Sequence, residues 1–301
     1  MYKLLTEIID GGQILINEPM KNHTSFKIGG PADFLVLPQR TEEIQKIIEV
    51  SKKEEIPTFI IGNGTDLLVR DKGLRGIVVK IAKNFNNIKI LESENKAIAQ
   101  SGISLSALAK LLLRNELTGF EFASGIPGTL GGAVTMNAGA YGGEMKDILE
   151  KIEVMDRQGN IFTLQGEEMQ LGYRKSAVQD QDLIVLTVTM QFQKGSYDEI
   201  KEKMRDLDHR RRTKQPLEWP SAGSTFRRPE GYYAGKLIQD AGLKGFSMGR
   251  AQVSDLHSGF VINKGGATAE EVIALIRHIQ DTVKKKFGVD LQTEVKIIGE
   301  E

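Results

Sequence analysis

The stretch GIPGTLGGA at residues 125–133 is followed closely by NAGAYGG at residues 137–143, and seven of the nineteen residues from 125 to 143 are glycine. Glycine has no Cβ, so the backbone N–H groups of a glycine-rich segment can come close to a phosphate or a ring edge. A third glycine turn, GNGTD at residues 62–66, follows a predicted strand. Three such segments favour a backbone-lined site over separate structural turns, and a dinucleotide is the natural occupant.

Two common nucleotide-binding folds do not account for these glycines. The turn GNGTDL at residues 62–67 lacks the third glycine of the Rossmann fingerprint, and no long crossover helix is predicted to open there. A Walker loop is also excluded, because Gly235 and Lys236 are followed by Leu237 instead of serine or threonine. Any bound dinucleotide is therefore expected in another fold.

The first region, residues 1–85, has the pattern of a small α/β unit. Residues 41–55 are predicted as a helix, with Thr41 as its cap and an apolar stripe of isoleucines. Predicted strands follow at residues 58–61 and 77–81, and the glycine turn lies at the end of the first strand.

The second region, residues 86–214, combines strands and helices. Its predicted elements are a strand at 97–100, a capped helix at 104–115, a hairpin at 152–164 that turns at 158–160, a long strand at 183–192 and a charged helix at 198–214. The last region, 215–301, contains a clear helix at 268–286. Thr268 and Glu271 form its capping box, and Gly288 ends it.

Composition excludes several classes of function. The chain has 40 basic and 40 acidic side chains, so no general nucleic-acid or membrane-surface role is expected. It has no cysteine, which excludes disulfides, thiolate metal sites and cysteine nucleophiles, and its histidines lack metal-ligand spacing. No signal peptide is recognised, and no apolar run reaches the roughly 18 residues that span a bilayer. A cytoplasmic protein without a metal is expected.

Six motifs occur in collinear order over nearly the whole chain: NHTSFKIGGPA at 22–32, GNGTDLL at 62–68, GIPGTLGGA at 125–133, GYRKS at 172–176, SAGSTFRRP at 221–229 and LQTEV at 291–295. Together they resemble the motifs of the UDP-N-acetylenolpyruvoylglucosamine reductases, a family that binds FAD. One departure is Thr65-Asp66, where many members have Ser-Asn; it puts a carboxylate near the expected position of the FAD phosphates. The short spacing between 176 and 198 resembles the shorter subclass of the family.

This resemblance implies an α+β protein. A two-lobed FAD-binding domain of the vanillyl-alcohol-oxidase type would comprise a first lobe at 1–85 and a second at 86–214, and a C-terminal α/β substrate domain would follow at 215–301. It also implies an oxidoreductase in which NADPH reduces non-covalent FAD. The reduced flavin then converts UDP-N-acetylglucosamine enolpyruvate to UDP-N-acetylmuramate for peptidoglycan synthesis.

The residues that the resemblance assigns to FAD lie in the three glycine segments. They are Gly62, Asn63, Gly64, Thr65, Gly125, Ile126, Pro127, Gly128, Thr129, Gly131, Gly132, Ala133 and Gly139.

By the same resemblance, three residues carry the chemistry. Ser224 gives a proton to C2 of the substrate after hydride from flavin N5 reaches C3. Arg174 stabilises negative charge that builds on the carboxylate side of the enolpyruvyl group. Glu294, on a predicted strand at 291–297 and pointing away from the face of Val295, either stabilises the enol form or organises the proton donor.

Substrate-binding residues are predicted from charge and position. Arg228 and Lys236 are candidates for the substrate diphosphate, which favours cations, and Tyr173 lies next to Arg174. The basic run at 209–212 is expected only to complement the dipole of its helix.

Two alternatives remain open. An FAD oxidase of the same fold would pass electrons from an alcohol to oxygen, but such relatives often tether flavin through histidine or cysteine, and the turn at 63–66 has neither. A flavin- or nucleotide-binding module without turnover would need the glycines alone.

Overall fold

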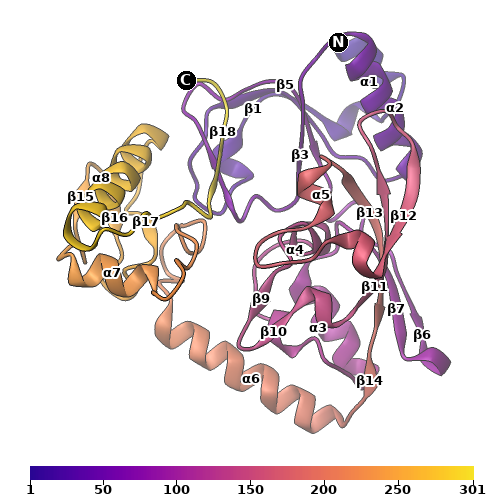
Figure 1. Ribbon diagram of the computed structural model, residues 1–301. Coiled ribbons are helices and arrows are strands. Elements are labelled where there is room, and N and C mark those ends of the chain that lie inside the picture. The colour runs from indigo at the N-terminus through magenta and orange to yellow at the C-terminus, as the bar shows by residue number, and fades with distance from the viewer. The chain divides into compact units, whose positions relative to one another are not determined.

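The computed structural model describes residues 1–301, and the chain divides into two compact units (Figure 1). Unit 1 comprises residues 1–15, 34–63 and 76–211, and unit 2 comprises residues 16–33, 64–75 and 212–301. Each unit mixes helices and strands, which confirms the α+β class. None of the helices has the length and apolar character that a membrane span requires.

The start of the chain forms two helices and a four-stranded sheet. The helices are α1 (Tyr2–Thr6) and α2 (Thr41–Lys53). The sheet has the order β1-β2-β5-β3, in which β3 and β5 run parallel. Its strands are β1 (Ile14–Pro19), β2 (Pro31–Val36), β3 (Thr58–Ile61) and β5 (Leu74–Lys80).

The predicted helix near residue 41 is confirmed, but its predicted cap is wrong. Thr41 is the first helical residue, and Arg40 takes the cap position. The buried carboxylate of Glu43 accepts hydrogen bonds from the backbone N–H groups of Gln39 at 2.7 Å and Arg40 at 3.2 Å. A carboxylate in the first turn thus satisfies donors that precede the helix, as in a capping box.

A five-stranded antiparallel sheet is the centre of unit 1, with the order β12-β11-β13-β7-β6. The predicted hairpin, the long strand and the helix capped by Ser104 are confirmed within it and beside it. The elements are β6 (Ile88–Leu91), β7 (Lys96–Gln100), β11 (Leu149–Met155), β12 (Ile161–Gln165), β13 (Ile184–Gln191), α3 (Leu105–Arg114) and α4 (Leu130–Thr135).

One long helix and several short elements complete unit 1. The helix α6 (Tyr197–Lys214), which ends just beyond this unit, is charged, and only Ile200, Leu207 and Arg211 of its residues are buried. The other elements are β8 (Leu117–Thr118), β9 (Gly139–Ala140), β10 (Gly143–Glu144), β14 (Gln193–Lys194) and α5 (Ala177–Asp180), together with 3-10 turns at Gly11–Gln13, Glu92–Glu94, Glu121–Ala123, Met145–Asp147 and Gly166–Met169.

Unit 2 packs the helix α8 (Ala269–Phe287) against β15 and β16 of a three-stranded sheet (Figure 1). The predicted capping box of Thr268 and Glu271 is confirmed, and Gly288 ends the helix in the left-handed conformation at φ 71°. The other elements are a 3-10 turn at Met20–Asn22, β4 (Leu67–Val69), α7 (Ala234–Asp240), β15 (Ser247–Met248), β16 (Ala251–Val253), β17 (Val261–Asn263) and β18 (Lys296–Ile298).

Residues 64–75, which lie early in the sequence, belong to unit 2. The strand β4 pairs in parallel with β18 near the C-terminus. The carboxylate of Asp71 accepts hydrogen bonds from the N–H groups of Ala269 and Glu270, at 2.9 and 3.0 Å, at the start of α8. An acidic side chain there satisfies free N–H groups and complements the helix dipole.

Candidate functional site

Two of the glycine segments meet in unit 1. Gly62 follows β3, and a Cβ atom placed on it would lie 2.2 Å from Oγ1 of Thr129. Thr129 caps α4, and its Oγ1 accepts a hydrogen bond from the N–H of Gly132 at 3.4 Å. The loop after β3 and the loop before α4 are therefore in direct contact.

Several of these glycines are required by the packing of the chain itself. A Cβ on Gly131 would lie 2.8 Å from Cβ of Ser101, and one on Gly139 would lie 2.8 Å from Cβ of Glu144. Gly128 has φ 137°, which L side chains rarely adopt. At Gly132 a Cβ would meet nothing closer than Thr129 Oγ1, at 3.5 Å. Of these four glycines, Gly132 is the one that the chain's own packing does not require.

The first backbone donors of α4 are already in use. The N–H of Leu130 donates to the carbonyl of Ile103 at 2.9 Å, and the N–H of Gly131 donates to the carbonyl of Ser101 at 2.8 Å. These two N–H groups anchor the helix to residues 101–103, so they do not form an open anion cradle.

The predicted arginine, Arg174, lies at the tip of a tight turn. Gly172 and Lys175 exchange backbone hydrogen bonds of 3.0 and 3.2 Å. Arg174 itself has φ 54°, an uncommon value for a residue with a side chain. Its guanidinium carbon lies 5.1 Å from the ring centroid of Tyr173, which is exposed. A conformation of this kind persists only where the surrounding structure imposes it.

One buried side chain connects this turn to the segment at 137–143. The Nδ2 of Asn137 donates to the carbonyl of Gly172 at 3.0 Å and to Oε2 of Glu144 at 2.8 Å. Its Oδ1 accepts from the N–H of Lys146 at 2.9 Å, and the residue is 1% exposed. Asn137 was not predicted, and its position inside a glycine-rich motif is the only signal that could have suggested it.

Two further hydrogen bonds hold the chain after the turn. Ser176 Oγ and Gln179 Nε2 both donate to the carbonyl of Thr135 in α4, each at 2.7 Å. Gln179 Nε2 also lies 3.1 Å from the carbonyl of Arg174. The Arg174 turn and the end of α4 therefore form one hydrogen-bonded structure within unit 1.

In unit 2, the structure brings together the neighbourhoods of Ser224 and Glu294. The N–H of Glu294 donates to the carbonyl of Thr225, the residue after Ser224, at 2.9 Å. Thr225 is also held by the carbonyl of Gly259, and its Oγ1 accepts from the N–H of Val261 at 3.0 Å. The predicted strand at 291–297 is wrong in extent: the regular strand is Lys296–Ile298, and Glu294 lies just outside it next to a single bridge at Thr293.

The two predicted cations of unit 2 have different surroundings. The guanidinium carbon of Arg228 lies 4.0 Å from the ring centroid of Tyr233, and its Nε donates to the carbonyl of Tyr232 at 3.3 Å. Lys236 is an exposed side chain on α7, and it pairs with Asp240 at 2.8 Å. Arg228 is thus oriented by its neighbours, whereas Lys236 lies on a solvated helix face.

The second half of the turn at 62–66 belongs to unit 2. Gly64 has φ 62°, and a Cβ on it would lie 2.2 Å from the carbonyl oxygen of His23. Its own carbonyl accepts from the N–H of Ser25 at 3.0 Å. Gly64 is therefore required by its backbone conformation and by the nearby chain at 23–25.

Comparison with known proteins identifies the family. Residues 215–298 match the model of the UDP-N-acetylenolpyruvoylglucosamine reductase C-terminal domain, and residues 32–165 match an FAD binding domain. A UDP-N-acetylenolpyruvoylglucosamine reductase from Caldanaerobacter subterraneus subsp. tengcongensis is 56% identical over 98% of this chain and 97% of its own. The chain belongs to this reductase family.

Other reductases of the family are similar to this chain over nearly its whole length. The protein from Clostridioides difficile is 52% identical over 100% of this chain and 98% of its own. The crystal structure of the Thermus caldophilus reductase has a TM-score of 0.80 and 33% identity, and it covers 94% of this chain and 97% of that one. The resemblance predicted from the motifs is thereby confirmed, as are the fold class and FAD as the cofactor.

Two buried polar atoms beside the glycine segments fit a bound flavin dinucleotide of this reductase. Ser101 is 2% exposed, its Oγ has no hydrogen-bond partner, and it packs against Gly131. Arg211 is 6% exposed, its Nε has no partner, and it packs against Gly125. Buried polar atoms are normally satisfied, so both positions are suited to polar atoms of a ligand.

Neither of these residues is among those predicted. The run at 209–212 was expected only to complement a helix dipole; Arg211 is in addition buried, which that prediction did not include. A sequence signal for it does exist. Arg211 lies four residues after Leu207 and eleven after Ile200, so it falls on the apolar face of α6.

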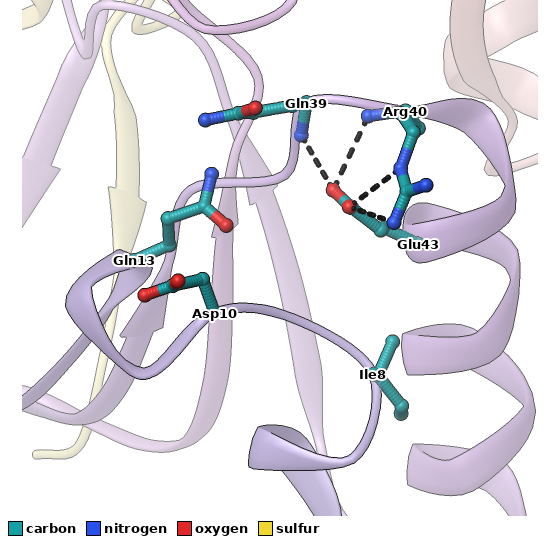
Figure 2. A pocket seen from close by; sticks show the side chains of 6 residues that line it. All are labelled: Ile8, Asp10, Gln13, Gln39, Arg40 and Glu43. Atoms are coloured by element: carbon teal, nitrogen blue, oxygen red, sulfur yellow. Dashed lines mark hydrogen bonds and ion pairs between the residues drawn. The ribbon is translucent and has the colours of Figure 1, made fainter.

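A separate cavity of about 590 Å³ lies at the start of α2 (Figure 2). Its lining includes none of the predicted site residues, and the carboxylate of Glu43 within it is bonded to Gln39 and Arg40. This cavity is therefore distinct from the predicted flavin site of the reductase. It is lined by Ile8, Asp10, Gln13, Gln39, Arg40 and Glu43.

Proposed function

We propose that this chain is an NADPH-dependent, FAD-containing reductase that converts UDP-N-acetylglucosamine enolpyruvate to UDP-N-acetylmuramate in peptidoglycan precursor synthesis. The observation that carries the proposal is the full-length match to proteins named for this activity, at 52 to 56% identity. Bound FAD would supply the hydride-transfer chemistry that links NADPH to C3 of the substrate.

The residues that would hold FAD are the predicted ones in the glycine segments. A Cβ on Gly132 would have room, and the contact of Gly62 with Thr129 brings the two loops together. Ser101 and Arg211 add a buried hydroxyl and a buried guanidinium beside them. FAD would be held without a covalent bond, because the chain has no cysteine and the turn at 63–66 has no histidine.

Ser224 would donate the proton that completes the reduction at C2. A neutral serine is a weak acid, so the group that receives its proton must be a strongly basic enol or enolate. Gly223, in the left-handed conformation at φ 73°, and the hydrogen bonds of Thr225 hold the backbone on either side of Ser224. This support favours a fixed position for the hydroxyl.

Arg174 would face the carboxylate of the enolpyruvyl group. Negative charge builds there during reduction, and a guanidinium held in place stabilises it without reorganising. The tight turn and its contacts to Asn137 and Gln179 supply that preorganisation. Glu294, whose N–H is bonded to the carbonyl of Thr225, would act beside Ser224. It would either stabilise the enol form or organise the proton donor.

Tyr173, Arg228 and Lys236 would bind the substrate. Arg228 is the stronger candidate for the diphosphate, because its guanidinium is already oriented over Tyr233. Lys236 would have to leave an exposed pair with Asp240, and such pairs cost little to break.

The proposal includes a cytoplasmic location and a division of the chain into functional parts. The first FAD-binding lobe would be residues 1–85, the second 86–214, and the substrate-binding domain 215–301. The match of residues 215–298 to the family's C-terminal domain supports the last boundary.

An anaerobic two-step titration tests the proposed activity. NADPH should bleach the flavin absorbance of the purified protein, and the enolpyruvyl sugar should restore it. An oxidase of the same fold would regain its absorbance on exposure to oxygen and not on addition of the sugar. A module without turnover would not bleach at all, and either result would reject the reductase.

A further inference from the structure

Arg211 on α6 is a buried cation without a counter-charge. Its side chain is 6% exposed, its Nε has no hydrogen-bond partner, and the structure gives its guanidinium no ion pair. The neighbouring Arg210 is different, because it is exposed and pairs with Asp206 at 2.7 Å. Adjacent residues of one basic run therefore have opposite surroundings.

The guanidinium of Arg211 lies close to residues of two of the glycine segments. A Cβ on Gly125 would lie 3.4 Å from Nε and 3.5 Å from Cζ of Arg211, so the backbone of Gly125 faces the guanidinium. Cζ also lies 5.7 Å from the ring centroid of Tyr141, in the segment at 137–143. Both segments were predicted to hold the flavin dinucleotide.

A charge in this position is costly unless something balances it. Arginine does not lose its proton in proteins, so burial cannot neutralise it as it neutralises a lysine or a histidine. The attraction of one tyrosine ring is small beside the cost of removing a cation from water. The missing negative charge must then come from a molecule that binds beside Arg211 and these segments.

We propose that Arg211 binds a negatively charged part of FAD. Two parts of that cofactor qualify: the diphosphate, which is always charged, and the isoalloxazine ring, which gains negative charge on reduction. The inference rests on the FAD site proposed above and adds to it a residue that no motif selected.

The test compares Arg211→Gln with the matched control Arg210→Gln, which removes an exposed charge from the same helix. Three quantities are measured: the affinity of the apoprotein for FAD and for riboflavin, the midpoint potential of bound FAD, and the melting temperature of the apoprotein. Loss of a charge-assisted contact should change either the FAD dissociation constant or the equilibrium constant for reduction of bound FAD by about 10- to 100-fold. The control should match the wild type.

The two charged parts of FAD give different results. If Arg211 binds the diphosphate, Arg211→Gln weakens FAD while riboflavin, which has no phosphate, binds as before. If Arg211 faces the isoalloxazine ring, Arg211→Gln lowers the midpoint potential, and any loss of affinity is the same for FAD and riboflavin. Arg211→Lys, which keeps the charge, should recover part of the effect in either case.

The stability of the apoprotein separates a ligand-binding arginine from a structural one. Replacing an unpaired buried cation by a neutral side chain should leave the melting temperature unchanged or raise it. A large fall in the melting temperature of the apoprotein, or unchanged affinities together with an unchanged potential, would overturn the proposal. Failure of the wild type itself to bind FAD would instead reject the FAD site.

Discussion

The side-chain amide of Asn137 donates a hydrogen bond of 3.0 Å to the carbonyl oxygen of Gly172. Through it, the last glycine segment supports the turn that carries Arg174, and the same side chain also bonds to Glu144 and Lys146. Asn137 has φ 39°, which asparagine tolerates better than most residues. If Arg174 acts as proposed, Asn137 is expected to serve as a positioning residue for it.

Replacing Asn137 by alanine should lower the free energy of unfolding by about 2 kcal/mol or more, because buried partners lose their hydrogen bonds. It should also slow flavin reoxidation by the enolpyruvyl sugar while leaving bleaching by NADPH unchanged. Urea denaturation and stopped-flow absorbance measure the two effects. Equal slowing of both phases would point to a general loss of structure instead of a displaced Arg174.

Arg174→Ala should slow flavin reoxidation by roughly 10²-fold or more through loss of charge stabilisation. Lysine should rescue only part of the rate, because it lacks the planar fork. Arg174→Gly offers a matched comparison: glycine adopts φ 54° without strain, so this variant should be as slow as the alanine variant yet more stable. Wild-type reoxidation in these variants would remove Arg174 from the mechanism.

Ser224→Ala should bleach normally with NADPH, since flavin reduction needs no proton for carbon. Recovery with the enolpyruvyl sugar should be slower by about 10² to 10⁴-fold if proton transfer becomes limiting. Ser224→Cys keeps a donor with a pKa of about 8.5 and should recover faster than the alanine variant. Slow bleaching alone would assign Ser224 to NADPH binding.

Gly131→Ala and Gly132→Ala form a pair that separates packing from ligand binding. The new Cβ at Gly131 would lie 2.8 Å from Cβ of Ser101, so this variant should lose about 1–3 kcal/mol of stability. At Gly132 the new methyl group has room, and alanine favours the helix, so stability should hold. Weaker FAD binding by a stable Gly132→Ala protein, measured by flavin fluorescence, would locate the cofactor at this backbone. Full FAD binding would mean that FAD does not approach it.

Glu121 should make the stability of unit 1 depend on pH in the acid range. Burial by itself would raise the pKa of Glu121, but hydrogen bonds from Thr118 and Gly119 and the charge of Lys203 outweigh it, so the pKa is lowered from 4.5. A carboxylate with a lowered pKa in the folded state stabilises above its ordinary pKa, and this contribution is lost as pH falls through the folded value.

The expected result is a urea midpoint that drops below about pH 4.5 in the wild type and drops less in Glu121→Gln. Glu43→Gln serves as a comparison, because Glu43 is another buried carboxylate of unit 1 but has other partners. An identical acid profile in the wild type and in Glu121→Gln would show that this carboxylate has no such role.

Local sequence signals were enough to predict several elements. Ser104 caps α3, Thr268 and Glu271 start α8, and Gly288 ends it, because each involves hydrogen bonds within a few residues of the chain. The motifs determined the family and therefore the cofactor. The mistakes at Thr41 and at the strand of Glu294 were also local, and concerned which neighbour caps a helix and how far a strand extends.

Which of these elements meet in space depends on long-range packing, which local signals do not contain. The transfer of residues 64–75 to unit 2, the contact of Gly62 with Thr129 and the burial of Arg211 all join parts of the chain that are far apart in sequence. A glycine looks the same in the sequence whether its missing Cβ makes room for a ligand or for another side chain. The spacing of Arg211 from Ile200 and Leu207 places it on the apolar face of α6, but only packing against the rest of unit 1 removes the water around its guanidinium.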